Sequence, residues 1–404
     1  MGPASASTRW PPRWNGAACA ACARRPHDAG LKPTATTATP ARPMGQPERT
    51  TDLPHTPFLA LDMDVFDRNV ARLADTIITR GGKRWRPHVK AIRSPTLALL
   101  LQAAGACGVT CANVREARAM VTAGITDVLI ASQVVQPADL EIVAHLNRHA
   151  TVTVAVDVAS SAALVSAAAR AAGTRIPVVV EVEVGLQRAG APAGAEAIAL
   201  AQLVHADSCM TFSGFMAWEG HTTRIADPAA KREAIHDAVA LLTSTASEAA
   251  AAGLPVDIVS CGGTGTFETT ALVDGVTEVQ AGGGVFGDLQ YREDFRVPLE
   301  RALTLCSTVV ARPTPTRIVC DAGFKSLAVY PKAPRVIGIG DVTGLSHSAE
   351  NLTIRVQHPA ERPCVGDRIL LEVGYADAST FLHRQIVGLR AGRVQSLHDL
   401  IAVR

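Results

Sequence analysis

The chain has 404 residues, a formal net charge of +2, 48% hydrophobic residues and 19% charged residues. Its length exceeds that of one small domain and fits a large barrel with a second domain. The balanced charge gives no basic face for nucleic acid, and no uninterrupted apolar run is long enough to cross a bilayer, so we expect neither partner.

The first 50 residues differ from the rest of the chain. They are rich in Ala, Pro, Thr and Arg and lack a hydrophobic period, which is typical of a disordered segment. The absence of glutamate before Glu48 also gives them some resemblance to a transit peptide. Because folded-looking sequence begins soon after Met44, we expect Met44 to be the true start.

The nine cysteines show no regular spacing. An odd count without a disulfide framework indicates a reducing compartment, so we expect a cytoplasmic protein. Cys19 and Cys22 form a CxxC pair, but no second pair or histidine stands at metal-ligand spacing, which disfavours a metal site there.

After residue 50 the pattern predicts a strand at 56–62 and a helix at 64–80, which Gly81 and Gly82 end. Short β-branched runs then alternate with Ala- and Leu-rich helical runs. The predicted strands of this repeat are 85–89, 109–113, 127–132, 151–157, 177–184, 212–218, 257–261 and 278–281. The predicted helices between them are 94–104, 115–123, 137–148, 160–172, 195–204 and 228–252.

These strands and helices predict an α/β fold with a (β/α)8 TIM-type barrel over residues 51–300, because about eight such units close a barrel. An open doubly wound sheet is the alternative, and the first turn lacks its glycine-rich fingerprint. After residue 300, alternating strands predict a mainly-β domain over 301–404, with strands at 304–310, 316–321, 352–356, 368–373 and 380–388. The strand at 58–61 is a candidate member of its sheet.

Lys90 closes the first barrel strand, at the end where such barrels hold their active sites. A desolvated lysine is a nucleophile that forms Schiff bases with carbonyl groups, although a lone lysine near a turn is more often simply solvated. Other polar side chains also follow strand ends: Gln133, Asp157, Arg188, Glu219 and His221. Together they favour an active site at this end of the barrel.

Two glycine clusters, 262–266 and 282–284, follow the seventh and eighth strands. Either alone could be a tight turn, but adjacent loops at this end of a barrel commonly bind phosphate through backbone N–H groups. An aldehyde-binding lysine and a phosphate site together point to pyridoxal phosphate (PLP), an electron sink for chemistry at the α-carbon of amino acids.

The chain resembles the fold-type III PLP enzymes, and among them the D-threonine aldolase / D-serine dehydratase family with its alanine racemase-like barrel. The matching motifs are 86–90 (RPHVK), 131–135 (ASQVV), 181–190 (EVEVGLQRAG), 217–221 (AWEGH), 262–266 (GGTGT), 280–282 (QAG) and 321–325 (DAGFK). Their order and spacing run through most of the chain from residue 57 to 390, which makes the set specific.

The resemblance implies roles for several residues. Lys90 would bind PLP as a Schiff base, and Arg188 would lie beside the ring hydroxyl or the substrate carboxylate. Trp218 occupies the family's usual tyrosine position near the ring. The phosphate would be held by Thr264, Gly265, Thr266, Gly282 and Gly283. His88 and His221 are candidate polar contacts, or structural histidines.

The resemblance also implies a divalent metal (Mn, Mg or Zn), bound in the β domain by a His and an Asp or Cys two residues apart. In the matching stretch 374–380 (GYADAST), Asp377 is present and Tyr375 replaces the histidine. One carboxylate is a poor transition-metal site, although His347 or His383 could supply an imidazole. Tyr375 is itself a candidate acid or base, or a packed tyrosine.

These features predict a PLP-dependent lyase that acts on small β-hydroxy-D-amino acids, with aldol cleavage to glycine and an aldehyde as the leading reaction. β-Elimination of water and racemisation are the alternatives within this enzyme class. A non-catalytic PLP-binding homeostasis protein is the alternative of another class, which the β domain disfavours. By resemblance, we expect a homodimer and a small amino-acid substrate.

Overall fold

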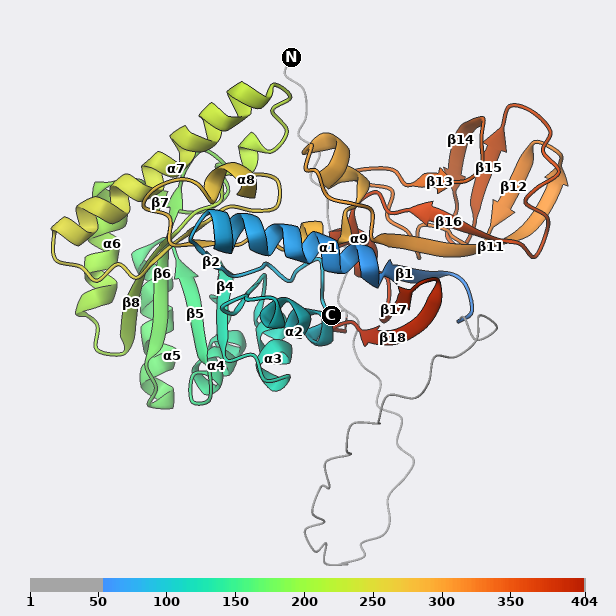
Figure 1. Ribbon diagram of the computed structural model, residues 1–404. Coiled ribbons are helices and arrows are strands. Elements are labelled where there is room, and N and C mark those ends of the chain that lie inside the picture. The colour runs from blue at the N-terminus through green and yellow to red at the C-terminus, as the bar shows by residue number, and fades with distance from the viewer. Residues whose placement is uncertain (1–53, 403–404) are drawn as a thin grey trace, which may run out of the picture. The chain divides into compact units, whose positions relative to one another are not determined.

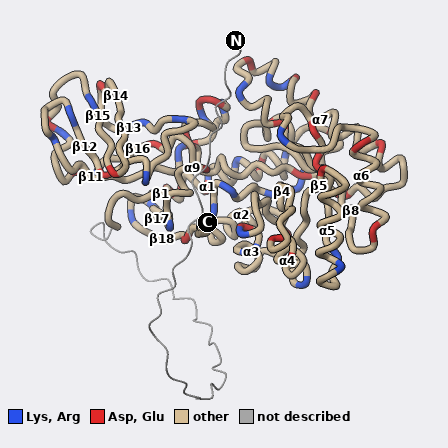
Figure 2. Tube along the Cα trace, turned by 180° about the vertical axis from the view of Figure 1, so that it is seen from behind, with Lys and Arg blue, Asp and Glu red and all other residues tan. Residues whose placement is uncertain are grey.

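The computed structural model describes residues 54–402, which lie within one compact unit, Pro47–Arg404. The expectations for residues 1–50 fall outside the described residues. Figure 1 shows a barrel and a second, strand-rich part. Within residues 54–402, no helix is both long and apolar enough to span a membrane. Figure 2 shows positive and negative side chains interspersed along both parts of the trace.

The first sheet is a barrel of parallel strands, as predicted. Its strands, in spatial order, are β2 (Arg84–Trp85), β10 (Glu278–Val279), β9 (Ile258–Cys261), β8 (Met210–Met216), β6 (Ile176–Glu183), β5 (Thr151–Val156), β4 (Asp127–Gln133) and β3 (Val109–Cys111). Just beyond β2, His88 pairs with Thr110 of β3 in a parallel bridge, and the Val89 N–H donates to the Thr110 carbonyl at 2.8 Å. This bridge joins the two ends of the strand order. A short strand, β7 (Ala191–Pro192), pairs with β6.

Helices follow the barrel strands: α2 (Pro95–Ala103), α3 (Val114–Thr122), α4 (Pro137–Leu146), α5 (Ala159–Ala172), α6 (Ala195–Ala206), α7 (Pro228–Ala251) and α8 (Phe267–Thr270). Three of them begin with a proline, whose fixed φ suits the first helical position. Val- and Ile-rich strands such as β5 and β6 are buried along most of their length, as parallel strands covered by helices require.

The first described elements link the two parts of the molecule. Strand β1 (Phe58–Asp62) leads into α1 (Met63–Ala74), which continues as a π-helical turn (Asp75–Arg80). The Asp62 carboxylate caps α1 by accepting the N–H groups of Asp64 and Val65, both at 3.0 Å. The predicted helix at 64–80 is therefore present, with a wider last turn.

The second sheet has the order β14-β15-β12-β11-β1-β17-β18, with β16 pairing to both β11 and β13. Its C-terminal strands are β11 (Leu303–Thr314), β12 (Arg317–Cys320), β13 (Arg335–Ile337), β14 (Val342–His347), β15 (Leu352–Val356), β16 (Arg368–Glu372), β17 (Gln385–Arg390) and β18 (Arg393–Asp399). Strand β1 lies between β11, which is antiparallel to it, and β17, which is parallel. The mainly-β fold predicted for this region is confirmed.

The predicted start of the strand at 380–388 was wrong. Residues Ala376–Thr380 form a helical turn, α9, and β17 begins only at Gln385. Tertiary contacts hold this turn, because the Ala376 N–H donates to Asp288 at 2.7 Å and the Thr380 hydroxyl donates to the Ala91 carbonyl at 2.9 Å. These bonds bring α9 of the β domain against the segment that follows Lys90.

Candidate active site

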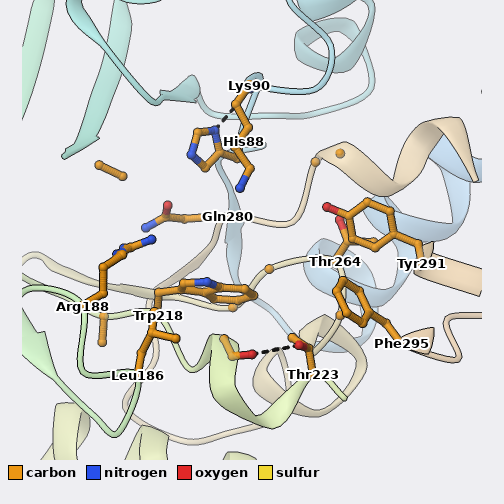
Figure 3. Close-up of a pocket in the computed structure, with 18 of the residues that line it drawn as sticks. His88, Lys90, Leu186, Arg188, Trp218, Thr223, Thr264, Gln280, Tyr291 and Phe295 are labelled. Atoms are coloured by element: carbon orange, nitrogen blue, oxygen red, sulfur yellow. Dashed lines mark hydrogen bonds between the residues drawn. The ribbon is translucent and has the colours of Figure 1, made fainter. Parts of the chain in front are cut away.

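A cavity of about 250 Å³ opens at the carboxyl ends of the barrel strands. Most of the predicted site residues line it: Lys90, Arg188, Trp218, Thr264, Gly265, Gly282, Gly283 and Tyr375. Figure 3 shows Lys90 extending into the space between Arg188, Trp218 and Thr264. The chain therefore brings together side chains that are up to 285 positions apart in the sequence (Lys90 and Tyr375).

Lys90 lies in the turn that follows β2. Its backbone N–H donates to Nδ1 of His88 at 3.3 Å, which holds the start of this turn. Its Nζ atom lies 3.5 Å from Oδ2 of Asp377, whose side chain is 13% exposed. The other carboxylate oxygen of Asp377 is buried and has no hydrogen-bond partner in residues 54–402.

His88 lines the same cavity as a neutral imidazole. Burial holds its pKa well below the usual value, and the positive charges of Lys90 and Arg188 act in the same direction. His221, the other histidine considered from the sequence, packs its ring against Gly185, where an added Cβ would lie 2.7 Å from the ring. His88 therefore faces the cavity, and His221 supports the backbone after β6.

Arg188 is held at the cavity by a buried carboxylate. Its Nη2 atom donates to Oε1 of Glu181 at 3.2 Å, and Glu181 is 3% exposed. The second oxygen of Glu181 accepts from the Gln133 amide. Because both oxygens are engaged, the carboxylate is fixed and orients the guanidinium.

Trp218 lies flat against the glycine turns on either side of it. An added Cβ at Gly220 or at Gly263 would come within 2.4 Å of the indole ring. Only glycine at these two positions leaves the ring where it is. The indole thus forms a planar wall of the cavity, as Figure 3 shows.

The loops after β9 and β10 form another part of the lining. In the described part of the chain, the N–H groups of Thr264, Gly265 and Gly283 donate no hydrogen bond, whereas the Gly284 N–H donates to the Thr264 hydroxyl at 3.0 Å. At Gly282, a Cβ would lie 2.4 Å from the His88 carbonyl oxygen. Free N–H groups along a glycine-rich wall suit an anionic group such as phosphate.

Thr266 does not line the cavity. Its hydroxyl donates at 2.6 Å to Glu219, a fully buried carboxylate that also accepts from the Thr270 hydroxyl at 2.8 Å and the Gly262 N–H at 3.2 Å. Thr266 is therefore better placed to shape the loop than to touch a ligand.

Two phenols stand beside Asp377. Burial raises the pKa of Tyr375, and the negative charge of Asp377 raises it further. The same causes, in the same order, raise the pKa of Tyr291 well above its usual value. Both phenols are therefore neutral at ordinary pH and act as hydrogen-bond donors rather than as bases.

Asp288 connects the segments that carry these phenols. Its Oδ1 atom accepts the Tyr291 N–H at 2.9 Å, and its Oδ2 atom accepts the Ala376 N–H at 2.7 Å. Burial raises the pKa of Asp288 to about 7, a shift to which the charge of Asp377 adds and which the backbone hydrogen bonds oppose. The carboxyl group thus ties the end of the barrel to the turn that holds Tyr375 and Asp377.

Comparison with known proteins gives consistent matches. Family models described as alanine racemase, N-terminal domain, and putative serine dehydratase domain match residues 61–290 and 302–389. D-threonine aldolase of Arthrobacter sp is 34% identical over 366 residues, covering 90% of this chain and 95% of that protein. The chain belongs to the D-threonine aldolase family, with an alanine racemase-type barrel.

Two further relatives agree. 3-Hydroxy-D-aspartate aldolase of Paracoccus denitrificans (strain Pd 1222) is 32% identical, covering 86% of this chain and 92% of that protein. The crystal structure of D-threonine aldolase from Filomicrobium marinum matches with a TM-score of 0.81 and 31% identity, covering 85% of this chain and 95% of that one. The predicted family, its lyase class and its barrel-plus-β-domain fold are therefore confirmed.

The cavity fits the PLP that the D-threonine aldolase family implies. A lysine amine, a planar indole wall and free backbone N–H groups face one space. These are the parts needed to hold an aldehyde, a ring and a phosphate. The neutral His88 and the fixed Arg188 complete the polar lining.

The β-domain side of this region, around Tyr375 and Asp377, does not fit a metal ion. No group of three or more His, Cys, Asp or Glu side chains that could hold an ion occurs in residues 54–402. Tyr375 is a neutral phenol, and Asp377 is one carboxylate that faces Lys90. His383, one of the imidazoles considered from the sequence, shares a 2.7 Å hydrogen bond with the Ser326 carbonyl, and neither it nor His347 lines the cavity.

Some lining residues were not predicted from the sequence, among them Leu186, Met216, Gln280, Tyr291 and Phe295. Gln280 lies in a matched motif, and its amide donates to the Ser260 hydroxyl at 2.9 Å. Tyr291 and Phe295 come from a π-helical turn (Gln290–Asp294) and the residue after it. A short charged turn has no hydrophobic period, so only the glycine clusters before it pointed to this region.

Proposed function

We propose that the protein is a PLP-dependent aldolase that cleaves small β-hydroxy-D-amino acids into glycine and an aldehyde. The relatives named above are aldolases of this type. The observation that carries the proposal is the Lys90 amine, which reaches into a cavity with free backbone N–H groups on one wall and Asp377 at 3.5 Å.

In this proposal Lys90 would hold the PLP aldehyde, the N–H groups of Thr264, Gly265 and Gly283 would hold its phosphate, and Trp218 would lie beside its ring. Gly282 lets its backbone pack closely against the His88 carbonyl, since an added Cβ would lie 2.4 Å from that oxygen. Arg188, fixed by Glu181, faces the ring hydroxyl or the substrate carboxylate. When bound, PLP supplies an electron sink for bond breaking at the α-carbon.

The residues beside Lys90 handle the proton of the substrate β-hydroxyl. Asp377 is the candidate base, because its Oδ2 atom lies 3.5 Å from Nζ of Lys90, where the substrate would be bound. Tyr375, held neutral by burial and by Asp377, donates a hydrogen bond to an oxygen that gains negative charge.

β-Elimination and racemisation start from the same bound substrate, so the cofactor-binding residues do not distinguish them from aldol cleavage. The C-terminal match to a putative serine dehydratase domain favours elimination as the second candidate. That same match argues against a PLP-binding homeostasis protein, since such proteins usually lack this domain.

Product analysis of the purified, PLP-loaded protein tests the proposal. D- and L-threonine, D-serine, threo-3-hydroxy-D-aspartate and D-alanine would be the substrates. Glycine with an aldehyde from the D-β-hydroxy compounds is the expected result. Keto acid and ammonia would instead identify a dehydratase, and inverted stereochemistry a racemase. Turnover of none of these compounds would contradict the enzymatic proposal.

We also propose a homodimer and a cytoplasmic location. Cysteines support the location, because the seven within the described residues are all free. The dimer rests on the resemblance to the family. Light scattering on the purified protein would measure its mass in solution. The mass of a single chain at micromolar concentration would contradict the dimer.

A further inference from the structure

A second cavity, of about 380 Å³, adjoins the first and shares Lys90 with it. Its other lining residues are Arg93, Asn113, Arg115, Glu116, Asp377, Phe381, Ile401 and Ala402. Because Lys90 borders both cavities, a group joined to the cofactor at the lysine end has room to extend into the second one.

The second cavity has more cationic than anionic side chains. Three cations (Lys90, Arg93 and Arg115) face two carboxylates. Glu116 accepts from the Ala112 N–H at 2.7 Å and the Asn113 amide at 3.1 Å, and one oxygen of Asp377 faces Lys90 at 3.5 Å while its other oxygen has no partner in the described residues. The two arginines are therefore the groups left to bind an added anion.

No salt bridge joins Arg93 or Arg115 to a carboxylate anywhere in residues 54–402. Arg93 is 6% exposed, and its Nε atom is buried without a hydrogen-bond partner in this range. Its guanidinium lies 4.4 Å from the centre of the Phe381 ring and donates to the Ile401 carbonyl at 2.5 Å. The charge of Glu116 acts on Arg93, but no salt bridge joins the two side chains, so a bound anion would supply the direct counter-ion that this buried cation lacks.

We propose that Arg93 and Arg115 form a carboxylate subsite for the substrate, next to Lys90. The planar guanidinium fork matches a carboxylate in shape and charge. This inference rests on the proposed function and deepens it. The carboxylate has two sources: the α-carboxylate that every amino acid carries, or the second carboxylate of a dicarboxylic β-hydroxy amino acid.

Arg115→Gln is the first test variant, because Arg115 is exposed at the start of α3 and its loss leaves the core intact. Arg118→Gln is the matched control, since Arg118 is exposed on the same helix and does not line this cavity. Calorimetry with malonate on the PLP-loaded protein measures binding without turnover. We expect the malonate Kd to rise about tenfold in Arg115→Gln, and to change less than about twofold in Arg118→Gln.

Steady-state kinetics then identify the source of the carboxylate. If KM rises in Arg115→Gln for both D-threonine and threo-3-hydroxy-D-aspartate, the subsite takes the α-carboxylate. If it rises only for the dicarboxylic substrate, the subsite takes the second carboxylate. Arg93→Lys keeps the charge but loses the planar fork, so we expect it to weaken malonate binding while the protein stays folded.

The subsite and the proposed function fail in different ways. Malonate binding that depends on Arg115 in a protein without aldolase activity would support the subsite and contradict the aldolase. Equal malonate affinities and equal KM values in wild type, Arg115→Gln and Arg118→Gln would overturn the subsite, even if the aldolase is active. Wild type that binds no malonate would also overturn the subsite.

Discussion

The two ends of the active-site cavity differ in how they relate to the D-threonine aldolase family. The barrel end, with Lys90 and the glycine loops, carries the family's motifs and fits PLP. The β-domain end, with Tyr375 in this cavity and Asp377 beside Lys90 in the adjoining one, departs from the expected metal pair and offers a neutral phenol and one carboxylate. The barrel end therefore fits the cofactor that the family implies, whereas the β-domain end does not offer the metal donors expected from the resemblance.

Loss of the barrel-end lysine should have the largest effect. Lys90→Ala removes the amine that we propose binds PLP, so we expect activity to fall by at least about 10³-fold and the visible Schiff-base absorbance to disappear. Absorbance after dialysis against PLP-free buffer, and borohydride fixation followed by mass spectrometry, measure this. PLP that borohydride still fixes in the variant would contradict the role of Lys90.

Asp288 joins the two ends, and its titration should appear in the stability of the protein. Its pKa is raised from 3.8 to about 7 by burial, so the folded state keeps a proton that the unfolded state has lost. This extra proton stabilises the folded state at low pH, and the stabilisation is lost as the pH rises from 3.8 to about 7. Wild type should lose about 3 kcal/mol of unfolding free energy between pH 5 and 8 relative to Asp288→Asn.

Urea unfolding of both proteins at several pH values measures this difference. Asp288→Asn is nearly isosteric and cannot ionise, so it separates the titration from the loss of one backbone hydrogen bond. Parallel pH profiles of unfolding free energy for the two proteins would contradict a buried, protonated Asp288.

A smaller effect is expected at the β-domain end. Tyr375→Phe keeps the ring and removes the phenol donor, so we expect kcat to fall about tenfold while the PLP absorbance stays unchanged. Stopped assays of glycine formation measure kcat. Unchanged turnover would make Tyr375 a packing residue and would leave Asp377 as the only one of the two β-domain residues with a role in the reaction.

Metal removal should have the smallest effect. Because one carboxylate and a neutral phenol form a poor site for a divalent ion, EDTA should change kcat by less than about twofold, and added manganese should not raise it. Activity that EDTA abolishes and manganese restores would show that this end binds metal through other donors.

The sequence was sufficient to predict the barrel, because buried parallel strands and their covering helices have clear and different periods. All eight predicted barrel strands are present, but the first, predicted at 85–89 with Lys90 closing it, ends at Trp85, so Lys90 lies in the turn beyond it. The β domain was predicted less completely. Strand β14 is exposed or half-exposed at every position, so it gave no buried-strand signal, and β13 and β18 were also missed.

The unpredicted parts of the site depend on contacts between distant segments. The turn at Ala376–Thr380 forms because Asp288 and Ala91 bond to it, and neither residue is near it in the sequence. Arg93 was not singled out, because its burial against Phe381 and Ile401 arises only when the end of the chain returns to the barrel. Periodicity carries no information about such pairings.

The position of β1 has a consequence for synthesis of the chain. Ala60 of β1 bonds to Thr304 of β11, 244 residues later, and the other neighbour, β17, is made later still. On the ribosome, this strand therefore emerges early and finds its two partners only after the barrel has been translated. A fragment that starts after residue 62 lacks a central strand of the second sheet, so a cut near residue 300 does not divide the chain into two complete sheets.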